Sequence, residues 1–307
     1  PCAPARVCAP DAARTLVFSD DPEDPAVSGV LYADTLRKGA AYRIYVYHAN
    51  GGTAPRKFSV VVLNQGAAMA SVRIERSAVG TPGADYLGIG KDVARRYLAP
   101  PSPRTVTVPP GARIVLDPAL DAATAQRLEL VHAIYDVTPD ADLKLSVVTV
   151  GPGVDAAAAT AGLPLLPFDG KHARGTFPDA DLAVFVDPLA GPAGSKLGRL
   201  RLGADLVDPH LIGRDATTGN AISLVGNFGV VYTMHPAAGM VAAVAPRGGA
   251  WAGASEQATV VTALPGASSF VDADAVRLPT VVPGGALRLM TAGSSSLPVD
   301  LVVTSAP

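Results

Sequence analysis

The stretch that decides the fold class reads Ala41-Tyr42-Arg43-Ile44-Tyr45-Val46-Tyr47. Its side chains alternate between two faces, one made of Tyr42, Ile44 and Val46 and the other of Arg43, Tyr45 and Tyr47. A period of two residues is the pattern of a β-strand. Asn50-Gly51-Gly52 follows this run, and a second β-rich run extends from Lys57 to Leu63. The segment therefore predicts a β-hairpin.

Short runs of the same kind, bounded by Gly or Pro, recur along the whole chain. The 31 glycines and 28 prolines among 307 residues supply far more turn chemistry than a helical bundle tolerates. Only residues 86–98 suggest a helix in the first half, and Gly88-Ile89-Gly90 within them indicates a turn. The other predicted strands are 15–18, 71–75, 106–108, 114–116, 128–137, 143–150, 181–186, 196–202, 221–225, 229–234, 240–245, 259–264, 275–278, 286–290 and 299–303.

The clearest change of composition lies at Gly151-Pro152-Gly153 and the alanines that follow. We predict an all-β protein of two tandem antiparallel β-sandwich domains of immunoglobulin-like type. Residues 1–14 are a cysteine-containing segment, 15–150 the first domain, 151–162 a linker and 163–307 the second domain. In each half a strand ends in a histidine before a turn, which suggests an internal duplication, although turn chemistry alone also produces such echoes.

Composition and charge exclude several classes of partner. The 25 basic and 27 acidic residues give a net charge of −2, which provides no drive toward nucleic acid or anionic lipid. No apolar run approaches the roughly 20 residues of a transmembrane helix. Cys2 and Cys8 are either disulfide-bonded or free thiols. The low charged fraction of 17% and a start without methionine or leader suggest an exported protein, located in the cell envelope or outside the cell.

Histidine is the residue type most able to bring metal chemistry to this chain. Imidazole is the usual ligand of copper and zinc, and convergence of the histidines near strand ends and turns would make a copper site. Arg174 would then attract a small anion such as superoxide, or else would pair with an acid such as Asp179 or Asp181 and fix a loop. The alternative is histidines used singly as hydrogen-bonding residues. The candidate ligands are His48, His132, His172 and His235.

Other candidate sites carry weaker patterns. The acids of residues 20–24 lack the Asp-x-Asp-x-Asp-Gly spacing of a calcium loop, so they suggest at most a weak calcium site. Ser294-Ser295-Ser296 has no Gly-x-Ser-x-Gly elbow around it, and this argues against a nucleophilic serine. Trp251, within a Gly-rich loop, suggests either a sugar-stacking platform or a plug of the core.

Seven short motifs carry a family resemblance. They are Gly29–Tyr32, Tyr47–Asn50, Val131–Asp136, His172–Phe177, Gly226–Val230, Pro246–Gly249 and Leu297–Leu301. Through them the chain resembles exported bacterial proteins described as copper amine oxidase N-terminal-like or stalk-domain proteins. This resemblance implies an envelope location and a pair of β-rich modules, without amine oxidation. A looser resemblance links the chain to copper-only superoxide dismutases, from which it departs because it lacks His-x-His and keeps both cysteines at its start.

The expected function is that of an exported interaction or assembly module in a surface-layer type complex, with other cell-envelope proteins as partners. The alternative is a copper-dependent enzyme similar to superoxide dismutase. The sequence leaves open whether the protein is an enzyme.

Overall fold

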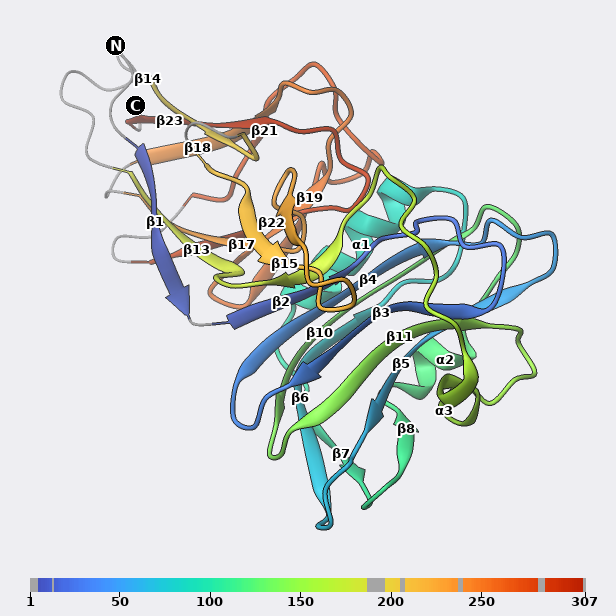
Figure 1. The fold of residues 1–307 in the computed structure, drawn as a ribbon. Helices are drawn as coiled ribbons and strands as arrows, with labels where there is room; N and C mark the ends of the chain where they lie inside the picture. The colour runs from blue at the N-terminus through green and yellow to red at the C-terminus, as the bar shows by residue number, and fades with distance from the viewer. Residues whose placement is uncertain are drawn as a thin grey trace.

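The structure is a computed structural model that describes residues 5–12, 14–186, 197–204, 208–236, 240–280 and 285–305. Its strands form four sheets, which pack in pairs as two sandwiches (Figure 1). The prediction of an all-β fold is confirmed. Within the described residues no helix is long and apolar enough to cross a membrane.

The first sandwich contains an eight-stranded and a five-stranded sheet. The larger sheet has the order β16-β15-β12-β2-β4-β10-β6-β7, and the smaller has the order β3-β11-β5-β8, with β9 paired to β5. The strand bounds are β2 (Arg14–Ser19), β3 (Gly29–Leu36), β4 (Ala41–Ala49), β5 (Arg56–Leu63), β6 (Ala70–Val79), β7 (Arg104–Val108), β8 (Arg113–Val115), β9 (Thr124–Ala125), β10 (Leu130–Pro139), β11 (Leu143–Val150), β12 (Arg174–Phe177), β15 (Leu211–Arg214) and β16 (Ala221–Leu224).

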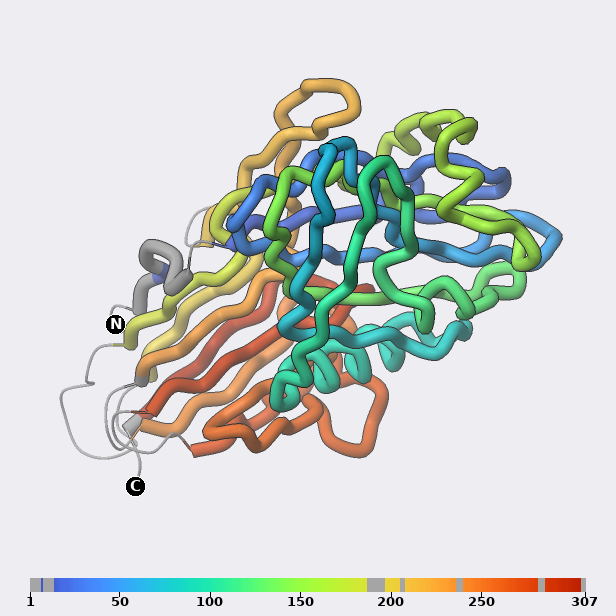
Figure 2. Tube along the Cα trace, turned by 90° about the horizontal axis from the view of Figure 1, so that it is seen from below, coloured from blue at the N-terminus to red at the C-terminus, as the bar shows by residue number. Residues whose placement is uncertain are grey.

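The second sandwich contains a six-stranded sheet, β1-β13-β17-β22-β19-β20, and a four-stranded sheet, β14-β23-β18-β21. Figure 2 shows strands of the larger of these sheets, in yellow to red, side by side next to the first sandwich. The strand bounds are β1 (Ala5–Ala12), β13 (Asp181–Val186), β14 (Leu197–Leu202), β17 (Val231–Pro236), β18 (Met240–Pro246), β19 (Gly253–Gln257), β20 (Val260–Leu264), β21 (Val276–Arg277), β22 (Leu287–Thr291) and β23 (Val299–Ser305).

The strand pairing crosses the predicted domain boundary in both directions. β1, from the first segment of the chain, pairs with β13 of the second sandwich, and β12, β15 and β16 complete a sheet of the first sandwich. The sheets are also not purely antiparallel, because β2 pairs with β4 and β13 with β17 in parallel. The all-β class is therefore confirmed, whereas the tandem immunoglobulin-like pair and the internal duplication stay predictions.

The predicted hairpin around Asn50 is wrong. β4 and β5 belong to different sheets, so the turn carries the chain from one layer of the sandwich to the other. The Asn50 side chain holds this turn: Nδ2 donates to the carbonyls of Ala54 and Ala125, and Oδ1 accepts from the Gly52 N–H. β17 and β18 likewise lie in different sheets of the second sandwich.

Helix α1 (Tyr86–Leu98) lies between the sandwiches and contacts β6 and β10 on one side and β19, β20 and β22 on the other. The predicted helix over 86–98 is confirmed, and the predicted turn at Gly88-Ile89-Gly90 is wrong because both glycines belong to the helix. Gly90 permits a close approach, since a Cβ there would lie 2.6 Å from the Gly293 carbonyl oxygen. The short helices α2 (Pro118–Ala122) and α3 (Ala156–Ala159) and the 3-10 turn η1 (Thr160–Gly162) lie in connections.

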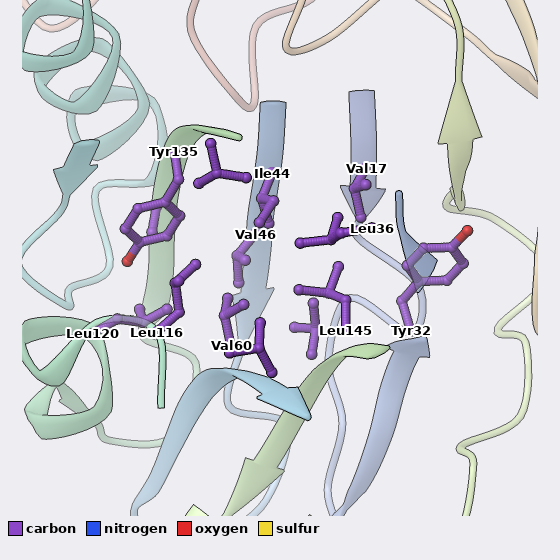
Figure 3. Packing of buried hydrophobic residues seen from close by; sticks show 14 of the residues in the cluster. Val17, Tyr32, Leu36, Ile44, Val46, Val60, Leu116, Leu120, Tyr135 and Leu145 are labelled. Atoms are coloured by element: carbon purple, nitrogen blue, oxygen red, sulfur yellow. The ribbon is translucent and has the colours of Figure 1, made fainter. Parts of the chain in front are cut away.

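The core of the first sandwich fills the space between its sheets. Figure 3 shows Ile44 and Val46 of β4 facing residues of the opposite sheet such as Val60 and Leu145. The predicted alternation along β4 is confirmed, because Tyr42, Ile44 and Val46 all join this core.

The other face of β4 is buried as well. Tyr45 and Tyr47 belong to a further apolar cluster that also includes Tyr97 of α1, Val231 of β17 and Met290 of β22. This cluster joins the two sandwiches. It explains why both faces of β4 are closed to solvent although the strand alternates between aliphatic and aromatic or charged side chains.

Candidate functional site

A cavity of about 210 Å³ opens where the two sandwiches meet. Its first wall comes from the end of β2, the loop after it, and β4. Its second wall comes from the segments that precede β12 and β17 and from the loop that follows β22. The lining residues are Phe18, Asp20, Glu23, Tyr45, Tyr47, His172, Phe228, Gly293, Ser294 and Ser295.

The floor of the cavity is aromatic. β2 and β4 run in parallel with Phe18 beside Tyr45, and their rings stack with centroids 4.8 Å apart. Tyr47, two residues further along β4, stacks on Tyr45 at 6.3 Å, so the period of the strand aligns the rings. Burial raises the pKa of both tyrosine hydroxyls above the ordinary range. Phe228, from the loop before β17, adds a fourth ring.

One end of the cavity holds a histidine between two carboxylates. His172 Nδ1 lies 2.7 Å from Asp169 Oδ2, and its Nε2 lies 2.5 Å from Glu23 Oε2. Although partial burial alone would lower the pKa of His172, these two acids raise it above its ordinary value. His172 therefore bridges the two acids, and both of its ring nitrogens are engaged by carboxylates.

Asp20 lies beside this bridge and differs from its acidic neighbours. Its Oδ1 is buried and accepts no hydrogen bond in the structure. Burial, followed by the negative charges of Glu23, Asp169, Asp21 and Asp24, raises the pKa of Asp20 well above its ordinary value. Asp20 is thus a half-buried acid with one buried oxygen and an excess of negative charge around it.

A second hollow continues the cavity along the surface. This hollow of about 440 Å³ shares Phe18, Asp20, His172 and Phe228 with the first, and it extends toward Ile222 and Leu224 of β16. Phe168, which also lines it, is 53% exposed. The two hollows form one groove with Asp20 where they join.

Arg174 fixes a loop, as one of the two interpretations predicted. The side chain is buried, and its Nε lies 3.3 Å from both Asp21 Oδ2 and Asp215 Oδ2. Its Nη1 donates to the carbonyls of Leu31 and Leu166. The suggested partners Asp179 and Asp181 are not the ones the structure gives, because Asp181 pairs with Arg43 and Arg14.

His48 and His132 are not brought together. On the neighbouring strands β4 and β10, His48 lies opposite Val131 and His132 opposite Tyr47. This offset of one residue turns the two imidazoles to opposite faces of the sheet. His48 bonds Ser19 Oγ and the Pro22 carbonyl, whereas His132 Nδ1 bonds the Val46 carbonyl.

The remaining candidate ligands are also separate from one another. His235 lies in β17 and stacks on Phe185 at 5.1 Å, and His172 is bound by its two acids. No group of three or more His, Cys, Asp or Glu within the described residues is arranged to hold a metal ion. The predicted copper site and the suggested calcium site therefore gain no support from this part of the chain, and superoxide dismutase-like activity stays a prediction.

Trp251 and the cysteines complete the predicted candidates. Trp251 is fully buried in the core of the second sandwich, so the interpretation as a core plug is confirmed. Cys2 lies outside the described residues, and its pairing with Cys8 stays a prediction.

The sequence alone does not predict this cavity. Its walls combine residues from both halves of the chain, and no local motif joins them. Two signals were present: the aromatic face of residues 45 and 47, and the acids of residues 20–24, which were considered only as calcium ligands. The motifs His172–Phe177 and Gly226–Val230, noted for the family resemblance, supply two of the lining residues.

Comparison with known proteins does not assign the chain to a family. No family model matches it, and no curated protein matches it. Among solved structures, it is similar to a cupin 2 conserved barrel domain protein from Leptotrichia buccalis, with 10% identity, 91% of each chain covered and a TM-score of 0.16. Vicilin from Corylus avellana (hazelnut) shows 8% identity over 94% of this chain and 86% of vicilin, with a TM-score of 0.14. At these TM-scores the likenesses carry no argument.

Proposed function

We propose that this protein is a non-catalytic binding protein whose ligand occupies the cavity between the two sandwiches. The observation that carries the proposal is the cavity itself, in which four aromatic rings meet Asp20, an acid with one buried oxygen that has no hydrogen-bond partner. Concave sites with apolar walls and a few convergent polar groups are the usual places for small ligands.

The chemistry of the lining favours binding over catalysis. His172, the one imidazole at the cavity, has both nitrogens bound to carboxylates. Ser295 Oγ is bound to the backbone of Ala252. His172 and Ser295 are thus held in structural contacts. The composition supports a location in the cell envelope as part of this proposal, and assembly with other envelope proteins stays a prediction.

A thermal-shift screen tests the proposal. The panel contains choline, arginine, glucose, citrate and phosphate, each at millimolar concentration. A ligand at about 100 times its Kd stabilises the folded state by about 2.7 kcal/mol, which corresponds to a Tm increase of about 5–10 °C for a chain of this size.

Two tryptophan variants locate the binding. Ser294 is exposed at the cavity, and S294W should block the cavity and remove the shift. Ser268 is exposed in the loop after β20 and does not line the cavity, so S268W should keep the shift. If S294W binds as well as the native protein, or if no compound of the panel or of a wider library shifts the native Tm, the proposal is wrong.

A further inference from the structure

The cavity has a charge imbalance that a ligand would correct. Five carboxylates meet at this end of the groove; the cationic side chains beside them are His172 and Arg174, and Lys171 lines the wider hollow. His172 is shared between Glu23 and Asp169, and Arg174 between Asp21 and Asp215. The charges that act most strongly on Asp20 are all negative. Asp20 therefore lacks a cation of its own.

The lining beside Asp20 indicates what kind of cation fits. Rings carry negative charge on their faces and attract organic cations. Apolar surface comes from Tyr47 and Phe228 and from Phe18 and Tyr45, which are each 2% exposed, while the carboxylates of the lining belong to Asp20 and Glu23. A small metal ion keeps oxygen ligands and water around it, whereas an alkylammonium group has a low charge density and an apolar surface.

We propose that the cavity binds a small organic cation, an alkylammonium group, with the carboxylate of Asp20 as its counter-ion and the rings of Phe18, Tyr45 and Phe228 around its methyl groups. This inference rests on the proposed function. The volume of about 210 Å³ accommodates a group the size of trimethylammonium and leaves room for a short substituent. The wider groove over β16 receives that substituent.

Binding of this kind is linked to a proton. Burial and the neighbouring acids raise the pKa of Asp20, so a proton and the cation compete for its carboxylate. The titratable groups that face Asp20 are Glu23, Asp169, Asp21, Asp24 and His172, with the hydroxyls of Tyr45 and Tyr47. The affinity should rise with pH by up to tenfold per unit, until Asp20 is ionised in the free protein.

Titration calorimetry with choline and with 3,3-dimethylbutan-1-ol tests the charge requirement. The two compounds have the same shape, and only choline carries the positive charge. We expect choline to bind at least tenfold more tightly. Equal affinity, or binding of the alcohol alone, would overturn the organic cation while leaving the binding function intact.

The variants D20N, F228L and F228Y test whether choline binds in the cavity, and D142N is the control. D20N keeps the size and hydrogen-bonding capacity of a protonated acid; it should weaken choline binding at least tenfold and abolish its dependence on pH. F228L should also weaken it, because the aromatic face is lost, whereas F228Y should restore it. D142N removes the same charge from an exposed ion pair with Arg37 outside the cavity and should change nothing.

Two other outcomes separate the inference from the proposed function. If calcium or magnesium chloride alone stabilises the protein more than choline does, and D20N removes that effect, the site takes a metal ion and the organic cation is wrong. If glucose or citrate raises the Tm of the native protein but not that of S294W, and choline raises neither, the cavity is a binding site for another class of ligand. If no compound passes, both proposals are wrong.

Discussion

Replacement of Arg43 by methionine should destabilise the protein more than any other substitution of an arginine in the described residues. Arg43 lies in β4, fully buried on the face turned toward the second sandwich. Its Nε donates to Tyr97 Oη and Asp136 Oδ1, its Nη2 lies 2.6 Å from Asp181 Oδ1, and its Nη1 donates to the carbonyls of Ala180 and Gly229.

These contacts join three parts of the molecule. Tyr97 belongs to α1, Asp136 to β10, and Asp181 to β13 of the second sandwich. Although burial alone would lower the pKa of Arg43, Tyr97, Asp136 and Asp181 raise it above its ordinary value. The guanidinium therefore remains charged inside the protein, and its removal leaves buried acceptors without donors.

The magnitude follows from the loss of one partner of a buried charge network. Such a loss costs about 3–5 kcal/mol, which corresponds to a Tm decrease of about 6–20 °C for a chain of this size. Denaturation in urea, followed by circular dichroism, measures the free energy of unfolding. R43K should lie between R43M and the native protein, because lysine restores the charge but not the planar set of donors.

Arg14 provides the matched control for this experiment. Its Nη1 lies 2.6 Å from Asp181 Oδ2 and its Nε 3.5 Å from Asp136 Oδ1, so it meets the same two acids, but its side chain is 21% exposed. R14M should cost about 1 kcal/mol, because water replaces part of the lost contacts. The result would contradict this role of Arg43 if the free energy of unfolding of R43M lay within 1 kcal/mol of the native value, or if it were no lower than that of R14M.

Three further predictions concern α1, a buried histidine and the cavity. G90A should destabilise the protein by about 1–3 kcal/mol despite its higher helix propensity, since the new Cβ would meet the Gly293 backbone; an unchanged urea midpoint would contradict this. Burial lowers the pKa of His132 to about 4, so between pH 7 and pH 5 the unfolded state gains a proton that the folded state does not. Over this range the free energy of unfolding of the native protein should fall by about 2 kcal/mol relative to that of H132N. If the difference between the two proteins is the same at pH 7 and pH 5, His132 is not buried in its neutral form. D20N should raise the Tm at pH 8, because it removes a carboxyl whose raised pKa destabilises the fold above the ordinary pKa of an aspartate; a decrease would indicate that a contact of Asp20 stabilises the fold.

The strands could be predicted because their determinants are local. The alternation along residues 41–47 and the Gly and Pro residues at strand ends specify where the chain is extended, and the predicted strands match β4, β11, β13 and most others closely. The strands β1, β3, β9, β12, β15 and β19 were missed. β9, β12 and β15 have only two or four residues, too few to show a clear period of two, whereas the burial of β3 does not alternate regularly along its eight residues.

The pairing of the strands could not be predicted, because it depends on contacts distant in sequence. Asn50-Gly51-Gly52 has the chemistry of a hairpin, yet Asn50 bonds the carbonyls of Ala54 and Ala125 and guides the chain into the other sheet. The exchange of β1 and β12 between the two halves has no local signal either.

At the candidate site, too, local sequence does not determine which residues the strand pairing brings together. His48 and His132 are similar in sequence context, but a one-residue offset between β4 and β10 sends them to opposite faces. The reverse holds for Phe18 and Tyr45, which the parallel pairing of β2 and β4 brings into stacking contact. The acids near Asp20 could be noted from the sequence because of their charge, whereas the aromatic floor beside them follows from strand pairing that the sequence does not predict.

The most direct test of the account is a crystal structure of the protein with choline, grown at pH 8, where Asp20 is more readily ionised. The account predicts choline in the cavity between the sandwiches, with its ammonium group within about 4 Å of an Asp20 carboxylate oxygen and its methyl groups against Phe18 and Phe228. Choline bound elsewhere on the protein, or a cavity that holds only water at saturating choline, would contradict it.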